Sequence, residues 1–247
     1  CTAAAPLLIY SGTGFLDMTG ITGGTNPFSA LTLSGAGGIV RVGSSSNLGA
    51  AAVTFTSVTT AATLQVRNDN GGASNGTITY GNNIALNVAS ALGIIDVGNA
   101  GGFAATGNTV VFGALTNSTT ANSTGTLTIN GNNGYGVSFT SLALSSGTTG
   151  VATTLVANAP VTIAGGVSNA MTVTAGKGDT LVLDGISTGS ITGSITDATG
   201  GSLAAGGYTA ITKQGKGVWT LSGTNTNEGA TTVNNGVLII NGSSAAN

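Results

Sequence analysis

Short apolar stretches that alternate with small polar residues recur along the whole chain. Each spans three to five residues, and its middle position is often Thr, Asn or Gln. Successive side chains of a β-strand point to opposite faces, so this period of two predicts short strands with one buried face and one outward face. We expect strands at Leu31 to Leu33, Val53 to Phe55, Leu64 to Val66, Ile84 to Val88, Leu127 to Ile129, Val161 to Ile163, Met171 to Val173, Leu181 to Leu183 and Val218 to Leu221.

Gly and Asn cluster between these stretches. Clusters occur at residues 68–72, 81–83, 130–134 and 234–236. Both residue types adopt left-handed backbone conformations at low cost, so the clusters predict turns. No segment carries an apolar stripe with the 3.6-residue period of a helix, and we expect almost no helix.

Charge is nearly absent, and this excludes several classes of protein. Only 5% of the residues are charged, compared with roughly 25% in ordinary domains, whereas 40% are hydrophobic. This balance is the opposite of that of a disordered chain. Five basic residues and a net charge of −2 give no surface for phosphate backbones, so we expect no nucleic-acid partner. No apolar run reaches the roughly 18 residues of a membrane-spanning helix, and we expect no transmembrane segment.

Strands that recur every eight to twelve residues or so fit either a β-sandwich or a solenoid. The small side chains, the Asn-rich corners and the scarcity of charge favour stacking of like on like, as in a solenoid. The expected fold is all-β: a right-handed parallel β-solenoid (β-helix). With about 24 residues a coil, the chain would form roughly ten coils. The cross-section stays open.

The segment from Lys213 to Ile240 resembles a known family. Its Gly, Trp and Leu spacing is similar to that of the autotransporter-associated β-strand repeat, also called the passenger-associated transport repeat. Asn227 and Glu228 stand where the family usually has an aromatic and a small hydroxyl residue, so that corner is expected to pack differently. The matching scaffold positions are Lys213, Gly215, Gly217, Trp219, Leu221, Ser222, Gly223, Asn225, Gly229, Thr231, Val233, Gly236, Leu238 and Ile240.

The resemblance implies a solenoid coil in a bacterial, exported protein, adhesive or structural in role. It therefore implies an extracellular or cell-surface location. It implies no activity, because such repeats are scaffold. Trp219 could bind a sugar at a surface, but its place in the repeat favours a packing role.

The residues that catalysis commonly uses are scarce. The chain has no His, which excludes Ser-His-Asp and Cys-His catalysis and removes the commonest metal ligand. Of the seven dispersed acids, Asp179 and Asp184 are close in sequence, but their spacing places them on opposite faces of a strand. They cannot form a glycosidase pair from that strand alone. We expect no enzyme, no cofactor and no metal site.

Cys1 is the sole cysteine and the first residue, so no disulfide can form within the chain. Two interpretations stay open. Cys1 resembles the lipid-bearing residue of a processed bacterial lipoprotein, or it marks a processing or cloning boundary.

We divide the chain into residues 1–30, a cap or inter-subunit strand, and residues 31–247, a solenoid whose clearest repeat is 213–240. The apolar segment from Pro6 to Tyr10 and the weakly capped strand from Gly236 to Ile240 predict head-to-tail association.

The leading hypothesis is a structural, non-enzymatic protein whose copies join head-to-tail through the solenoid ends into a fibre or surface layer, with Cys1 at the junction. The alternative is a monomeric adhesin or stalk, lipid-anchored at Cys1, that binds cell-surface glycans or another cell. A third hypothesis, a β-helix enzyme acting on polysaccharide, would need distant acids to meet across coils.

Overall fold

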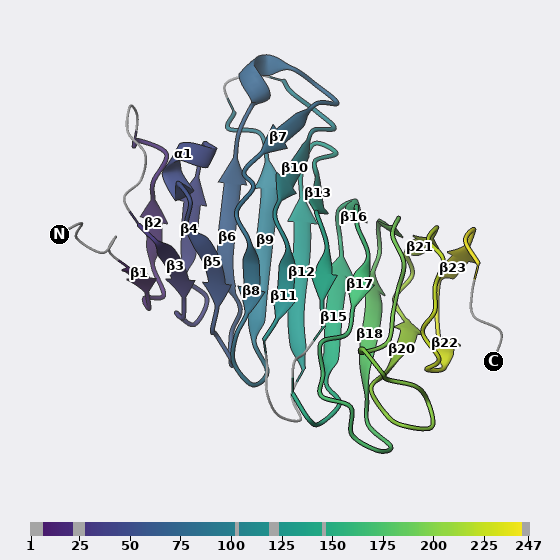
Figure 1. Ribbon diagram of the computed structural model, residues 1–247. Coiled ribbons are helices and arrows are strands. Elements are labelled where there is room, and N and C mark those ends of the chain that lie inside the picture. The colour runs from purple at the N-terminus through teal and green to yellow at the C-terminus, as the bar shows by residue number, and fades with distance from the viewer. Residues whose placement is uncertain (1–6, 22–27, 102–103, 119–123, 145–146, 244–247) are drawn as a thin grey trace.

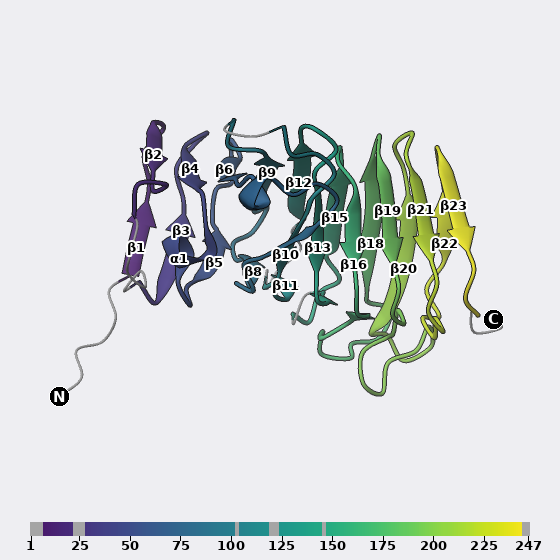
Figure 2. The same ribbon diagram turned by 90° about the horizontal axis from the view of Figure 1, so that it is seen from above.

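The protein is a parallel β-solenoid in the computed structural model, which describes residues 7–21, 28–101, 104–118, 124–144 and 147–243. Its coils stack along one axis from the N-terminal to the C-terminal end (Figure 1 and Figure 2). The strands form three sheets, in which every paired neighbour runs parallel. Helical residues make up 3% of the chain: the one-turn α1 (Ser45–Leu48) and the 3-10 turn η1 (Asn70–Gly72). The predicted fold class and the near absence of helix are confirmed.

Each sheet takes one strand from successive coils. Sheet A contains β1 (Leu7–Tyr10), β3 (Ala30–Leu33), β5 (Ala52–Phe55), β8 (Ile84–Leu86), β11 (Leu115–Asn117), β14 (Leu142–Ala143) and β17 (Val167–Ser168). Sheet B contains β2 (Phe15–Asp17), β4 (Ile39–Val42), β6 (Ala62–Arg67), β9 (Leu92–Gly98), β12 (Gly125–Gly131), β15 (Ala152–Ala157), β18 (Gly178–Gly185), β20 (Tyr208–Lys213) and β22 (Thr231–Val233). Sheet C contains β7 (Thr77–Thr79), β10 (Thr109–Phe112), β13 (Gly136–Phe139), β16 (Val161–Ile163), β19 (Thr188–Ile191), β21 (Val218–Leu221) and β23 (Val237–Ile240).

The coils do not all have the same cross-section. Those in the middle pass through sheets A, B and C in turn, and so have three sides. The first coils alternate between sheets A and B, with α1 in the chain between β4 and β5, and the last coils alternate between sheets B and C.

The number of turns is lower than the roughly ten expected: sheets A and C each collect seven strands, and sheet B collects nine. The expectation assumed a constant coil of about 24 residues. Coil length instead varies widely, because loops of different size join the strands: Leu92 is paired with Thr126, whereas Val218 is paired with Val237. The right-handed sense of winding stays a prediction.

Alternation of buried and outward residues builds the core. Strands such as β6 bury every second side chain, which is the period read from the sequence. Because successive coils pair in the same register, side chains of the same kind lie on top of one another. Tyr80, Phe112 and Phe139, for example, form a ladder with ring centroids 5.7 and 6.0 Å apart. The interior is thus a column of apolar side chains, whose removal from water drives folding.

One predicted strand, Met171 to Val173, is wrong. These residues form no strand, although Met171 is buried. The Asn169 side chain accepts a hydrogen bond from the Met171 backbone N–H at 2.9 Å, and this local turn takes the donor that a strand ladder would have used.

The first two strands belong to the same sheets as the rest. Leu7 pairs with Ala30 in sheet A, and Phe15 pairs with Ile39 in sheet B. They extend the solenoid by one coil, and the boundary proposed at residue 30 remains a prediction.

No helix among the described residues is long and apolar enough to cross a membrane.

Candidate functional site

The predicted repeat forms the last coils of the solenoid. Trp219 and Leu221 of β21 point inward and are almost fully buried. Trp219 has no exposed surface, and its Nε1–H donates to the Asp184 carbonyl at 3.3 Å. Trp219 is therefore a packing residue, and the interpretation as a surface sugar contact is wrong.

The repeat glycines lie where neighbouring coils approach too closely for a side chain. A Cβ on Gly217 would lie 2.1 Å from the Ser187 carbonyl oxygen, and one on Gly223 would lie 2.3 Å from the Gly193 carbonyl group. Gly229 is equally close to Thr209, at 2.4 Å from its carbonyl oxygen. Gly215 and Gly236 have φ of +73° and +68°, so they also supply left-handed turns.

Asn225 fixes the corner that follows β21. Its Oδ1 accepts the Ile195 backbone N–H at 3.1 Å, and its own backbone N–H donates to the Ser243 carbonyl at 2.8 Å. The side chain is buried and thus bridges one coil to the next. At the following corner, where the sequence departs from the family pattern, Asn227 Nδ2 donates to the Thr209 carbonyl and the Glu228 backbone N–H donates to Asp197.

The final coil is the exposed part of the repeat. Thr231 and Val233 of β22 are exposed, Leu238 of β23 is half-buried, and Ile240 is 48% exposed. Leu238 and Ile240 pair with Trp219 and Leu221 respectively, so they continue the interior columns. Ile240 stays exposed because no described strand covers the far side of β23.

Lys213, one of the matching scaffold positions, lies between Leu183 and Val233 in an inward column of sheet B, a buried setting that the sequence analysis did not predict. Its side chain has no exposed surface. Nζ donates to the carbonyls of Gln214 at 2.6 Å, Gly215 at 2.9 Å and Asn235 at 3.2 Å. Burial lowers the pKa of this ammonium group, and the Asp184 carboxylate opposes that change. Three carbonyls thereby replace the water that a charged group would otherwise need.

Charged side chains gather at the other end of the solenoid, on the outer face of sheet B. Arg41 Nε donates to Gln65 Oε1 at 2.6 Å, and Gln65 Nε2 donates to Asp96 Oδ2 at 2.9 Å. Arg67 pairs with the same Asp96 carboxylate. Several of these side chains occupy the same register position on consecutive strands of sheet B and so lie side by side. We call the following residues the polar row: Asp17, Arg41, Gln65, Asp96 and Asn130.

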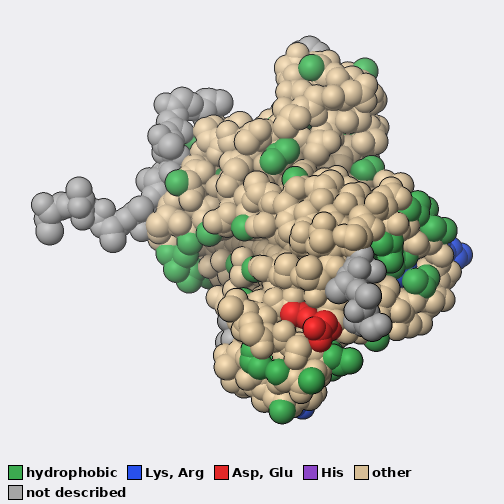
Figure 3. Space-filling view, turned by 45° about the vertical axis from the view of Figure 1, so that its right-hand side comes forward, with side chains coloured by type: hydrophobic (Ala, Val, Ile, Leu, Met, Phe, Trp, Pro, Cys, Tyr) green, Lys and Arg blue, Asp and Glu red, His purple; other side chains and the backbone are tan. Residues whose placement is uncertain are grey.

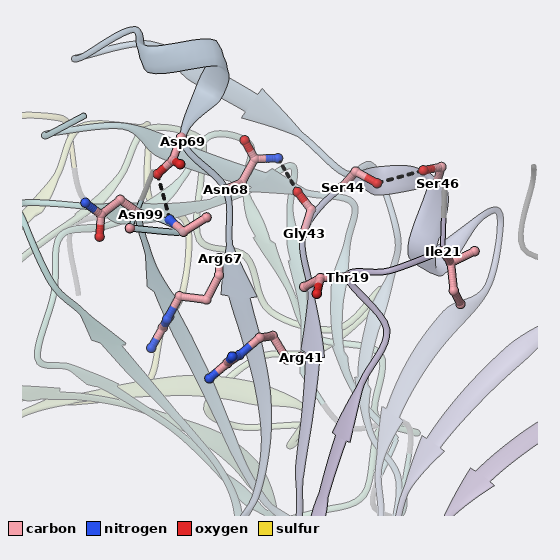
Figure 4. Close-up of a pocket in the computed structure, with 12 residues that line it drawn as sticks. Thr19, Ile21, Arg41, Gly43, Ser44, Ser46, Arg67, Asn68, Asp69 and Asn99 are labelled. Carbon is pink, nitrogen blue, oxygen red and sulfur yellow. Dashed lines mark hydrogen bonds between the residues drawn. The ribbon is translucent and has the colours of Figure 1, made fainter. Parts of the chain in front are cut away.

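An open cleft of about 700 Å³ adjoins the polar row. Parallel strands end at the same edge of a sheet, so the segments after β2, β4, β6 and β9 converge there. Asp69 Oδ1 accepts the Ala100 backbone N–H at 2.6 Å, and the hydroxyls of Ser44 and Ser46 are 2.7 Å apart. Figure 4 shows the Arg41 and Arg67 side chains lying beside each other below these groups. The lining residues are Thr19, Ile21, Arg41, Gly43, Ser44, Ser46, Arg67, Asn68, Asp69, Asn99, Ala100 and Gly101.

The sequence prediction missed this cleft, because its residues are far apart in the chain. A signal was present: the segments Phe15 to Asp17, Ile39 to Val42, Leu64 to Arg67 and Ile94 to Val97 each carry a polar or charged residue at the same strand position. Aligning the strands as repeats would have placed these residues side by side.

Asp179 and Asp184, the two acids that are close in sequence, do not face each other. Asp179 points inward and is fully buried, whereas Asp184 points outward from the same strand, as expected. The described residues contain no group of three or more acidic or cysteine side chains placed to hold a metal ion. Cys1, the predicted lipidation or junction residue, lies outside the described residues.

Tyr80, which packs against Phe112 in the aromatic ladder, carries a buried hydroxyl group. Its Oη has no hydrogen-bond partner among the described residues. Burial raises the pKa of this phenol. Tyr80→Phe retains the contact with Phe112 and removes an unpartnered polar group, so the free energy of unfolding should stay equal or rise by about 1 kcal/mol. Urea denaturation measures this, and a loss of stability would contradict it.

The comparisons with known proteins agree with this geometry. Residues 211–240 match the family model described as Passenger-associated-transport-repeat. No curated protein and no solved structure matches the chain. The repeat and the solenoid fold together suggest a surface-associated structural protein of the passenger type, a non-catalytic scaffold.

Proposed function

We propose that this chain is a structural, non-enzymatic protein of the cell surface or extracellular space, whose solenoid ends join copies head-to-tail into a fibre or layer. The observation that carries this proposal is the exposure of apolar side chains on both terminal coils. Leu7, Ile9 and Phe15 are at least half exposed at one end. At the other end, Val233, Val237, Ile239 and Ile240 are 39–51% exposed.

The two ends share one sheet, because sheet B runs through the whole solenoid from β2 to β22. β2 and β22 each have a strand on one side only among the described residues, as do β1 and β23. A second copy in the same orientation would continue the parallel ladder of sheet B from β22 to β2 and cover the half-buried Leu16. Figure 3, which brings the C-terminal coils forward, shows several apolar side chains on that side of the molecule.

Ile240→Lys tests this proposal. In the free chain the new ammonium group would lie at a half-exposed end, whereas in a joint it would be buried on an apolar column, at a cost of several kcal/mol. We expect rods that lengthen with concentration for the natural protein, and single short rods for the variant, measured by negative-stain electron microscopy and analytical ultracentrifugation.

Ile186→Lys is the matched control, because Ile186 is 71% exposed and follows β18, which is separated from the last strand of sheet B, β22, by β20. It should assemble as the natural protein does. Single short rods of the natural protein at every concentration would overturn head-to-tail assembly, and the anchored stalk would take its place. The lipid anchor at Cys1 remains a prediction that a mass measurement of the exported protein would test.

A further inference from the structure

We propose that the cleft at the carboxyl ends of β2, β4, β6 and β9 binds a neutral sugar residue of a glycan. The proposal does not depend on head-to-tail assembly. The volume of the cleft, about 700 Å³, lies within the range of roughly 300–1,000 Å³ that is typical of small-molecule sites. A single sugar ring fits this space with room for part of a neighbour.

The balance of charge favours a neutral ligand over an anion. Arg41 and Arg67 bring two positive charges, whereas Asp17, Asp69 and Asp96 bring three negative charges to the cleft and the adjoining polar row. The Arg67 guanidinium is already paired with Asp96. An anion would therefore meet no net positive potential.

The polar groups of the cleft suit hydroxyl groups, which each need a donor and an acceptor. Arg41 gives one N–H to Gln65, while its Nη1 is 3.6 Å from Asp17, too far for a hydrogen bond. The side chain is 36% exposed, so its remaining N–H groups can reach a ligand. Ser44 and Ser46 provide hydroxyls that can act either way, and the Asp69 carboxylate, whose Oδ1 accepts the Ala100 backbone N–H, lines the same cleft.

Apolar surface lies beside these groups. Ile21 and Ala100 line the same cleft, and both are exposed. Sugar rings present C–H groups as well as hydroxyls, so a lining that combines carboxylate, guanidinium and aliphatic groups matches a neutral ring better than a metal ion or a purely apolar ligand. The outer face of sheet B continues the pattern, because Asn158 Nδ2 donates to Asn130 Oδ1 at 3.1 Å further along the row. A second sugar unit would lie over this row.

The test uses a panel of free sugars and their short oligomers. Glucose, galactose, mannose and N-acetylglucosamine are the neutral probes, and glucuronate and glucosamine are the charged counterparts. Saturation-transfer NMR detects binding, and backbone resonances of Gly43, Asn99 and Gly101 report the location. We expect at least one neutral probe to bind with a Kd in the millimolar range or below and to shift these resonances.

Ala100→Trp fills the cleft without removing a side-chain hydrogen bond, and should weaken binding by about tenfold or more. Ala204→Trp is the matched control at an exposed position in the loop before β20, and should bind as the natural protein does. Circular dichroism checks that both variants fold. The proposal is overturned if no neutral probe binds, if only glucuronate or glucosamine binds, or if Ala100→Trp binds as tightly as the control.

Discussion

Trp219→Ala should lower the free energy of unfolding of the C-terminal coils by about 3–5 kcal/mol. The indole is fully buried, pairs in register with Leu238 on one side and Gly189 on the other, and donates a hydrogen bond to the Asp184 carbonyl. Truncation removes a large apolar surface from the core and leaves a cavity. Because each coil contacts only its neighbours, the loss should be concentrated in β19, β21 and β23.

Gly189 provides the second half of a double-mutant cycle. A Cβ on Gly189 would lie 2.3 Å from the Trp219 ring, so Gly189→Ala should also destabilise these coils. In a chain that already carries Trp219→Ala, the same substitution has space and should cost much less. The two effects are therefore expected to be strongly non-additive.

Amide hydrogen exchange, followed strand by strand, measures these effects, and urea denaturation gives the overall free energy. Val58→Ala is the control, since Val58 is half exposed and should change stability by less than about 0.5 kcal/mol. Additive effects of Trp219→Ala and Gly189→Ala would show that the indole does not occupy the space above Gly189.

The stability of the protein should depend on pH through Asp179. This carboxyl is fully buried inside β18; its Oδ1 accepts the Val151 backbone N–H at 2.9 Å, and its Oδ2 has no hydrogen-bond partner among the described residues. Burial raises the pKa of Asp179 from 3.8 to about 6, against the hydrogen bond from Val151. The folded state therefore holds this proton at pH values where the unfolded chain has released it.

Stability should fall as the pH rises through this interval. Below the unfolded-state pKa both states are protonated and Asp179 contributes no penalty; above a pH of about 6 the folded state has to bury a carboxylate. A shift of about two units corresponds to roughly 3 kcal/mol between the two limits. Asp179→Asn has no charge to bury and should lack this dependence.

The measurement is the difference in unfolding free energy between the natural protein and Asp179→Asn, taken by urea denaturation from about pH 4 to pH 8. We expect the difference to shift by about 3 kcal/mol in favour of the variant as the pH rises. The comparison cancels the other titrating groups, including Asp197, whose pKa burial also raises. Parallel pH profiles would show that the Asp179 carboxylate is solvated in the folded state.

Much of the fold could be predicted from local patterns. The alternation in Leu127 to Ile129 or Val161 to Ile163 fixes which side chains face inward, because a strand has a period of two whatever surrounds it. The prediction for Met171 to Val173 was wrong although the alternation is as good. There the Asn169 side chain accepts a hydrogen bond from the Met171 backbone N–H. The alternation of apolar and polar residues gives no information on that competing hydrogen bond.

The cleft was the part of the candidate site that local patterns could not reveal. Its residues follow four different strands, and they meet only once the coil lengths bring those strands into register. The repeat scaffold was easier to propose, because Gly217, Trp219 and Gly223 lie within one short motif, although each of them packs against the preceding coil.

The sequence by itself determined that the chain is all-β with little charge and that Asp179 and Asp184 face opposite ways, because these properties depend on composition and on the two-residue period of a strand. The small side chains and the Asn-rich corners favoured a solenoid over a sandwich, and the family resemblance favoured a packing role for Trp219. The tertiary structure alone decided the number of turns, the change from three sides to two at the ends, the cleft beside the polar row and the unpartnered oxygen of Asp179. Each of these depends on which coil lies beside which, and that is set by loop lengths and long-range register rather than by any local pattern.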